Sequence, residues 1–188
     1  MKKIAEPSPE ILAACKNGDK AAFKKLFDIY KMYAYNLIYK ITGQNSDHED
    51  LLQETFFQVY LSLRTFHGES AFTSWFHRVV VQVCSGDLRY KLAAKRNPGN
   101  AVLNLDDMQE SVPNKKESKE NSFALKDLVD KGLARLDDSL RIPLVLHIYS
   151  DMDIGEIAAI INIPEGTVKS RLFSARKQMK EFIENAER

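Results

Sequence analysis

The strongest constraint on the fold lies near the C-terminal end, in residues 153–179, which read DIGEIAAIINIPEGTVKSRLFSARKQM. Asp153 and Glu156 have the spacing of a capping box, which predicts that a helix begins here. Asn162 can adopt the left-handed conformation that ends such a helix, and Pro164 suits the first position of a second one. Two helices joined by so short a turn form a helix-turn-helix, whose second helix fits the major groove of DNA.

The second of these helices has two distinct sides. Its inward, apolar positions are predicted to be Val168, Leu172, Ala175 and Met179. The other side chains of its N-terminal half suit contacts with base edges and phosphates. These candidate DNA-binding residues are Thr167, Lys169, Ser170, Arg171, Phe173, Ser174, Arg176 and Lys177. The alternative is an ordinary helical hairpin with a solvated basic face.

The same segment resembles the promoter-binding region of bacterial extracytoplasmic-function (ECF) sigma factors, through GTVKSRL and the AR pair that follows it. The DNA-binding domains of response regulators carry a looser version of this motif. The resemblance implies that the eight candidate residues bind the −35 element of a promoter. The rest of the chain has to distinguish between the two families.

The N-terminal half is predicted to consist of amphipathic helices. A short helix is expected from Glu10 to Lys16, after a frayed stretch at residues 1–9. Asp19 should cap a long helix with an aromatic and aliphatic stripe, and Gly43 should end it. This pattern predicts an all-α protein.

Asp47 opens a further helix, which carries an acidic outward face with one aromatic residue. Asp50, Gln53, Glu54 and Phe57 lie on one side of it at helical spacing. An outward phenylalanine favours a protein partner, whereas acids near a helix N-terminus also occur simply because they complement the helix dipole. The motif EDLLQETF resembles the region with which sigma factors bind core RNA polymerase, and this resemblance favours the partner. Response regulators lack such a face, and their receiver domain alternates strands with helices.

The next loop and helix, residues 66–96, resemble the part of sigma factors that opens promoter DNA and binds the non-template strand of the −10 element. The resemblance implies a role in −10 binding for His67, Ser70, Arg78, Gln82, Arg89 and Lys91. Two positions depart from the usual pattern of the family: Gln82 replaces an asparagine and Gly86 replaces an aspartate. These departures concern base preference rather than the general role. Trp75 falls on the apolar stripe and is expected to be structural.

The organisation of the chain follows from its composition. Residues 97–121 are rich in Asn, Ser, Asp, Lys and Pro and lack helical periodicity, which predicts a flexible linker. We therefore expect two small helical domains, at 10–96 and at 122–185, and the second should contain the helix-turn-helix. In sigma factors such a linker passes through the polymerase channels.

Several function classes find no support in the sequence. Cys15 and Cys84 are far apart and outside any CxxC pattern, and the four histidines show no metal-ligand spacing. We predict no catalytic residue, no metal and no cofactor. With 44% hydrophobic residues, a formal net charge of +1, no signal peptide and no apolar run of membrane length, the chain is expected to be cytoplasmic, without membrane insertion.

The sequence thus predicts an alternative sigma factor whose partners are core RNA polymerase and promoter DNA. Whether an anti-sigma factor also binds it is left open. The rival hypotheses are a stand-alone two-domain transcription regulator, which would not need the acidic face, and a sigma-like helical interaction protein that has lost DNA binding. The retained Lys169, Arg171 and Arg176 speak against the latter.

Overall fold

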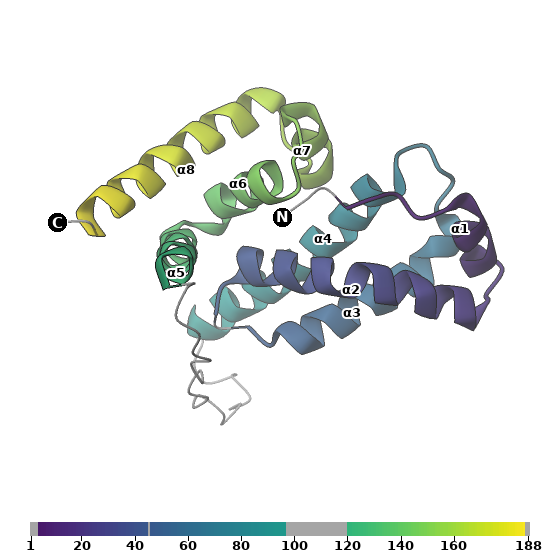
Figure 1. The fold of residues 1–188 in the computed structure, drawn as a ribbon. Coiled ribbons are helices and arrows are strands. Elements are labelled where there is room, and N and C mark those ends of the chain that lie inside the picture. The colour runs from purple at the N-terminus through teal and green to yellow at the C-terminus, as the bar shows by residue number, and fades with distance from the viewer. Residues whose placement is uncertain (1–3, 45, 97–119, 187–188) are drawn as a thin grey trace.

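The structure is a computed structural model that describes residues 4–44, 46–96 and 120–186. These residues form eight α-helices and one 3₁₀ turn, and no strand occurs among them, which confirms the predicted all-α class. Figure 1 shows the helices in chain order. Their bounds are α1 Pro9–Lys16, α2 Lys20–Thr42, α3 His48–Ser62, η1 Leu63–Thr65, α4 Phe72–Arg96, α5 Glu120–Arg135, α6 Asp138–Tyr149, α7 Ile154–Ile161 and α8 Glu165–Ala186.

The helix starts follow the local signals in the sequence. The Asp19 carboxylate accepts hydrogen bonds from the backbone N–H groups of Ala21 and Ala22, at 2.8 and 3.1 Å. The Asp47 carboxylate accepts one from the backbone of Asp50, at 3.1 Å. Such side-chain caps satisfy donors that a helix terminus otherwise leaves without partners.

The predicted capping box and left-handed turn are both present in the helix-turn-helix. The Asp153 carboxylate accepts from the Glu156 N–H at 2.8 Å, and the Glu156 carboxylate accepts from the Asp153 N–H at 2.9 Å. Asn162 ends α7 at φ 54° and ψ 53°. Pro164 precedes α8 rather than opening it, because its carbonyl already accepts the first helical hydrogen bond, from Val168.

Helix α2 is the central element of the N-terminal helices and packs against α1, α3 and α4. Tyr30 is fully buried, and its ring meets those of Phe72 and Phe76 edge-on. Trp75 is half-buried against Phe66 and Phe72, so its predicted structural role is confirmed. This aromatic core fixes α4 beside α2.

The C-terminal helices form a second layer, in which α8 packs against α5, α6 and α7. Val168, Leu172 and Ala175 are buried, as predicted for the inward side of α8, and Met179 is partly buried. No described helix has the length and apolarity needed to cross a membrane.

The N-terminal segment departs from the prediction. The sequence predicts that residues 1–9 fray, but residues 4–8 pack on the helices, so the prediction is wrong there. Pro7 is buried, and the Ala5 carbonyl accepts a 2.7 Å hydrogen bond from the Tyr30 hydroxyl. The physical reason lies in contacts that are distant in the sequence, which helical periodicity does not detect.

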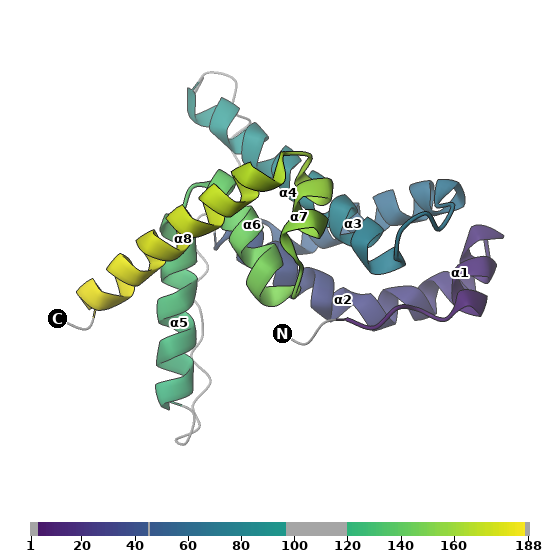
Figure 2. The same ribbon diagram turned by 90° about the horizontal axis from the view of Figure 1, so that it is seen from above.

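The two sets of helices also pack against each other, as Figures 1 and 2 show. Helix α4 contacts α7, and α2 contacts α5 and α6. Lys40 and Asp130 form an ion pair across this boundary, with only 8% and 12% of their side chains exposed. Tyr33 and Ser150, both buried, share a 3.0 Å hydrogen bond. The flexible linker predicted at residues 97–121 lies almost wholly outside the described residues, so the independence of the two domains stays a prediction.

Candidate polymerase-binding and promoter-binding surfaces

The acidic face of α3 is a shallow hollow open to solvent. Asp50, Gln53, Glu54 and Phe57 line it together with Leu51, so the structure brings the four predicted residues into one site. Phe57 is 54% exposed. A large exposed aromatic residue beside carboxylates is typical of a protein contact.

The charges of this face are available to a partner. Among the described residues, neither Asp50 nor Glu54 has a cationic partner within ion-pair distance. The Glu54 carboxylate accepts a single 2.7 Å hydrogen bond, from the Gln58 amide. The local field therefore favours basic groups on whatever binds here.

His67 and Ser70 lie on the exposed loop between η1 and α4. Gly68 has φ +80°, a conformation that a side chain would strain, so glycine is needed for this turn. Phe66, at the start of the loop, is buried against Phe72 and Trp75. The loop is thus anchored at its base and exposed at its tip.

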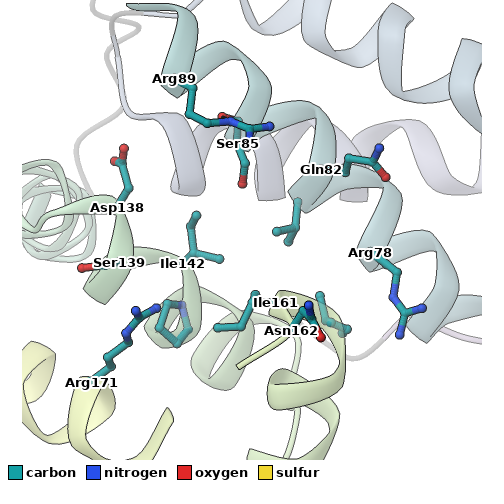
Figure 3. A pocket seen from close by; sticks show the side chains of 13 residues that line it. Arg78, Gln82, Ser85, Arg89, Asp138, Ser139, Ile142, Ile161, Asn162 and Arg171 are labelled. Carbon is teal, nitrogen blue, oxygen red and sulfur yellow. The ribbon is translucent and has the colours of Figure 1, made fainter. Parts of the chain in front are cut away.

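Three other predicted −10 residues lie along one side of α4. Arg78, Gln82 and Arg89, with Ser85 between them, line a cavity of about 440 Å³ (Figure 3). Arg78 and Gln82 are exposed. The Arg78 guanidinium nevertheless reaches α7, where it donates a 3.1 Å hydrogen bond to the Ala159 carbonyl. Arg89 donates to the Ser85 carbonyl at 3.1 Å.

The opposite wall of this cavity belongs to the helix-turn-helix side of the molecule. Figure 3 shows Asp138 of α6, Arg171 of α8 and Asn162, in the turn after α7, on the side of the cavity that faces α4. Three arginines and one aspartate line the cavity, so its surface is net basic. The structure therefore brings one predicted −35 residue, Arg171, to the predicted −10 face.

Lys91 lies apart from that group. Its ammonium forms an ion pair with Asp87 at 3.0 Å and donates to the Ser46 hydroxyl at 2.5 Å. Asp87 follows Gly86, so the chain has a carboxylate one position after the family's usual aspartate. The Lys91 charge is thus partly balanced within the N-terminal helices.

The outward face of α8 carries most of the predicted −35 residues. Phe173 is 73% exposed, and Lys169, Ser170, Arg176 and Lys177 are exposed as well. Thr167, Arg171 and Ser174 are half-buried. The Ser170 hydroxyl donates a 3.0 Å hydrogen bond to the Thr167 carbonyl.

Arg176 also borders an apolar groove that the sequence did not predict. This groove, of about 580 Å³, lies between α5, α6 and α8 and is lined by Val129, Leu133, Leu144, Ile148, Tyr149 and Met179, among others. Ile148 is 55% exposed, an unusual position for isoleucine. In the sequence Ile148 falls on the apolar stripe of this helix, four positions after Leu144, so helical spacing alone gives no signal of the groove.

The cysteines and the other histidines form no further site. Cys15 and Cys84 are buried free thiols, and burial raises the pKa of the Cys84 thiol to about 12, so it is neutral at physiological pH. No cluster of metal-ligating side chains occurs in the part of the chain that the structure describes.

Comparison with known proteins matches both halves of the chain. Residues 26–92 match the family "Sigma-70 region 2", and residues 126–179 match "Sigma-70, region 4". The first match contains the α3 face and most of α4, and the second contains the helix-turn-helix.

Relatives along nearly the full length are sigma factors. The ECF RNA polymerase sigma factor SigW of Bacillus subtilis is 29% identical over 173 residues, which cover 89% of this chain and 92% of that protein. The ECF RNA polymerase sigma-E factor of Haemophilus influenzae is 31% identical over 178 residues, covering 89% and 88%. The sigma-E factor of Escherichia coli strain K12 is 32% identical over 167 residues, covering 85% of each chain.

Two solved structures share the fold. CnrH, in complex with the cytosolic domain of CnrY, superposes with a TM-score of 0.64 at 16% identity, covering 94% of this chain and 96% of that one. The sigma factor RpoE of Bartonella quintana, in complex with the anti-sigma factor NepR, also gives 0.64, at 18% identity and with coverage of 86% and 96%. The chain therefore belongs to the ECF sigma factors of the sigma-70 family, which are not enzymes but bind core RNA polymerase and promoter DNA to direct transcription initiation.

Proposed function

We propose that three surfaces of this chain perform separate steps of initiation. The α3 face of Asp50, Gln53, Glu54 and Phe57 binds core polymerase. The loop at His67–Ser70 and the α4 face bind the non-template strand of the −10 element. The N-terminal half of α8 binds the −35 element in the major groove.

The observation that carries this proposal is the state of the α3 face. A phenylalanine ring that is 54% exposed lies there beside two exposed carboxylates without ion-pair partners, and this combination suits a protein partner that offers basic and apolar groups. A stand-alone regulator has no use for such a face. The acidity of the α3 face favours a protein over DNA as the partner, because phosphates would repel the two carboxylates.

For the promoter surfaces, support comes from chemistry and exposure. An unpaired base needs aromatic or polar groups on an accessible loop, and the His67–Ser70 loop is exposed. Duplex DNA needs cations around a protruding helix, and Lys169, Arg176 and Lys177 surround the exposed Phe173. Lys91 is the weakest member of the −10 set, because Asp87 and Ser46 already hold its ammonium group.

We further propose that the protein acts in the cytoplasm, where its polymerase is, and that an anti-sigma factor binds it. The related fold of RpoE was solved with the anti-sigma factor NepR. The apolar groove between α5, α6 and α8 offers an amphipathic helix a surface of suitable polarity.

Transcription in vitro with purified core polymerase tests the proposal. Adding the chain should produce start sites that core polymerase alone does not use. The Asp50→Lys/Glu54→Lys variant should abolish these transcripts while −35 duplex binding persists. Start sites that are unchanged by the chain, or fully retained by this variant, would overturn the proposal.

A further inference from the structure

The N-terminal segment, residues 4–8, lies across the start of α4 and is fastened there. Ile4 packs against the apolar core and Pro7 is buried. Between them, the Ala5 carbonyl accepts the 2.7 Å hydrogen bond from the fully buried Tyr30. These contacts on both sides fix the position of Glu6, which lies between Ala5 and Pro7.

Glu6 caps α4 from 66 residues away. Its carboxylate accepts hydrogen bonds from the backbone N–H groups of Phe72 and Thr73, each at 2.9 Å, and from the Thr73 hydroxyl. Ala71 is the residue immediately before the helix, and its methyl group cannot accept a hydrogen bond. The negative charge also complements the helix dipole. Two of the backbone donors at the start of α4 are therefore satisfied from a distant part of the chain.

This cap sets one end of the exposed loop. The loop leaves the core at the buried Phe66 and re-enters at Phe72, which is 2% exposed. The residues between them, 67–71, are all exposed, and Gly68 turns at φ +80°. The direction in which the loop projects therefore depends on the backbone at Phe72 and Thr73, which Glu6 holds.

We propose that Glu6 is a positioning residue for −10 recognition: it holds the first turn of α4 so that the loop at His67–Ser70 presents a preformed site for an unpaired base. This inference rests on the proposed function of the loop. A preformed site binds more tightly because less conformational freedom is lost on binding. Glu6 itself contacts no DNA in this scheme.

The test uses Glu6→Gln, which keeps the shape of the side chain but replaces one acceptor oxygen with an NH₂ donor. Glu10→Gln is the matched control, because Glu10 lies in the first turn of α1 and its carboxyl pKa is lowered by hydrogen bonds from its own backbone and from Ser8. Ala71→Ser supplies a hydroxyl at the N-cap of α4, where serine can accept from the same turn. Each variant is assembled with core polymerase and measured against a −10 non-template strand, its single-base variants and a −35 duplex.

We expect Glu6→Gln to bind the −10 strand roughly tenfold more weakly, the factor that corresponds to losing a helix cap, and to discriminate less among the single-base variants. Binding of the −35 duplex should be unchanged. Adding Ala71→Ser to Glu6→Gln should restore both affinity and base ranking.

Two other results overturn the inference in distinguishable ways. If the wild-type chain discriminates bases and Glu6→Gln preserves that ranking, while only the melting temperature falls, Glu6 is structural and the positioning role is wrong. If the wild-type chain binds all strands alike, the loop does not recognise the −10 element, and the proposed function of the loop fails together with the inference.

Discussion

Two candidate surfaces of the N-terminal helices differ in what lies over them. Among the described helices, α3 packs mainly on α2, α4 and η1, and Figure 1 shows it on the far side of α2 from α6–α8. The α4 face of Arg78, Gln82 and Arg89 instead forms a wall of a cavity whose other wall is α6, α7 and the start of α8.

The difference has a consequence for the order of events. Core polymerase can reach the α3 face in the arrangement that the structure shows. The proposed −10 role of the α4 face requires an open groove along α4 for a DNA strand of several nucleotides, so we expect the C-terminal helices to move away first. We therefore expect polymerase binding to precede −10 binding.

The largest expected effect is at the open face. The Asp50→Lys/Glu54→Lys variant reverses both charges. It should weaken core binding by about 2–5 kcal/mol, because the basic groups expected on the partner would repel the new lysines. The fold should persist, since both side chains are exposed. Competition with the wild-type chain for core polymerase measures the loss.

Glu49→Lys is the control for this experiment, because Glu49 is an exposed acid of the same helical turn but outside the hollow. It should leave core binding within the error of the assay. A double variant that folds normally and competes as well as the wild type would contradict the assignment of this face.

The sequence predicted the open face better than the covered one, for a physical reason. The caps at Asp19, Asp47 and Asp153 involve residues two or three positions apart, so local spacing reveals them. The α3 face follows in the same way from the helical period. Contacts between residues distant in the chain carry no such signature.

The covered face depends on distant contacts, which the sequence reasoning missed. Lys40 pairs with Asp130, 90 positions away, and Glu6 caps α4 from 66 positions away. The one sequence signal of the Lys40–Asp130 pair was the position of Lys40 itself, between Leu37 and Ile41 on the inward side of α2. A charged residue at a core position indicates a buried partner without saying where it lies.

The second prediction concerns the closure of the α4 face. Asp130→Asn leaves the Lys40 ammonium, which also lies over the Tyr149 ring at 5.2 Å, without its carboxylate. We expect the free energy that holds the two sets of helices together to fall by at most about 3 kcal/mol. The loss is limited because Lys40 can be hydrated again when the helices separate. The distance between labels at the exposed Lys24 and Lys180 should then increase and vary more.

Asp127→Asn is the matched control, since Asp127 lies on the same helix and pairs with Lys131 at the surface. It should leave the distance unchanged, and the exchanged pair Lys40→Asp/Asp130→Lys should restore closure. If the wild-type chain already shows the long, variable distance, the two faces do not differ in the free protein.

The third prediction compares exposed residues in the N-terminal half of α8 with one near its C-terminal end. Lys169→Ala should weaken binding to every −35 duplex about equally. It should also reduce the slope of log binding constant against log salt concentration by about one, as expected for a phosphate contact. Phe173→Ala should cost about 1–3 kcal/mol and relax preference at one position. Lys180→Ala, near the distal end of α8 and paired with Glu184, should have no effect.

Arg171 sharpens this comparison, because it lines the cavity beside α4. In the isolated chain the cavity keeps Arg171 partly away from DNA, so Arg171→Ala should weaken duplex binding less there than in the complex with polymerase. Equal losses in both states would mean that the cavity does not restrict Arg171. Binding curves at several salt concentrations, with and without core polymerase, distinguish the two cases.

The smallest expected effect is at Gln82, on the covered face. Gln82 carries the same amide as the family's asparagine, one methylene further from the backbone, so its donor and acceptor reach a different point. Losing one such hydrogen bond costs about 1 kcal/mol. We expect Gln82→Asn to change which base is preferred and Gln82→Ala to reduce discrimination between bases. Overall affinity should stay within a few fold of the wild type, since the loop, Arg78 and Arg89 remain.

The measurement is binding of polymerase complexes to a −10 non-template strand and its single-base variants. If all three proteins rank the strands identically, Gln82 does not contact the bases, and its place in the cavity wall reflects packing between the two sets of helices.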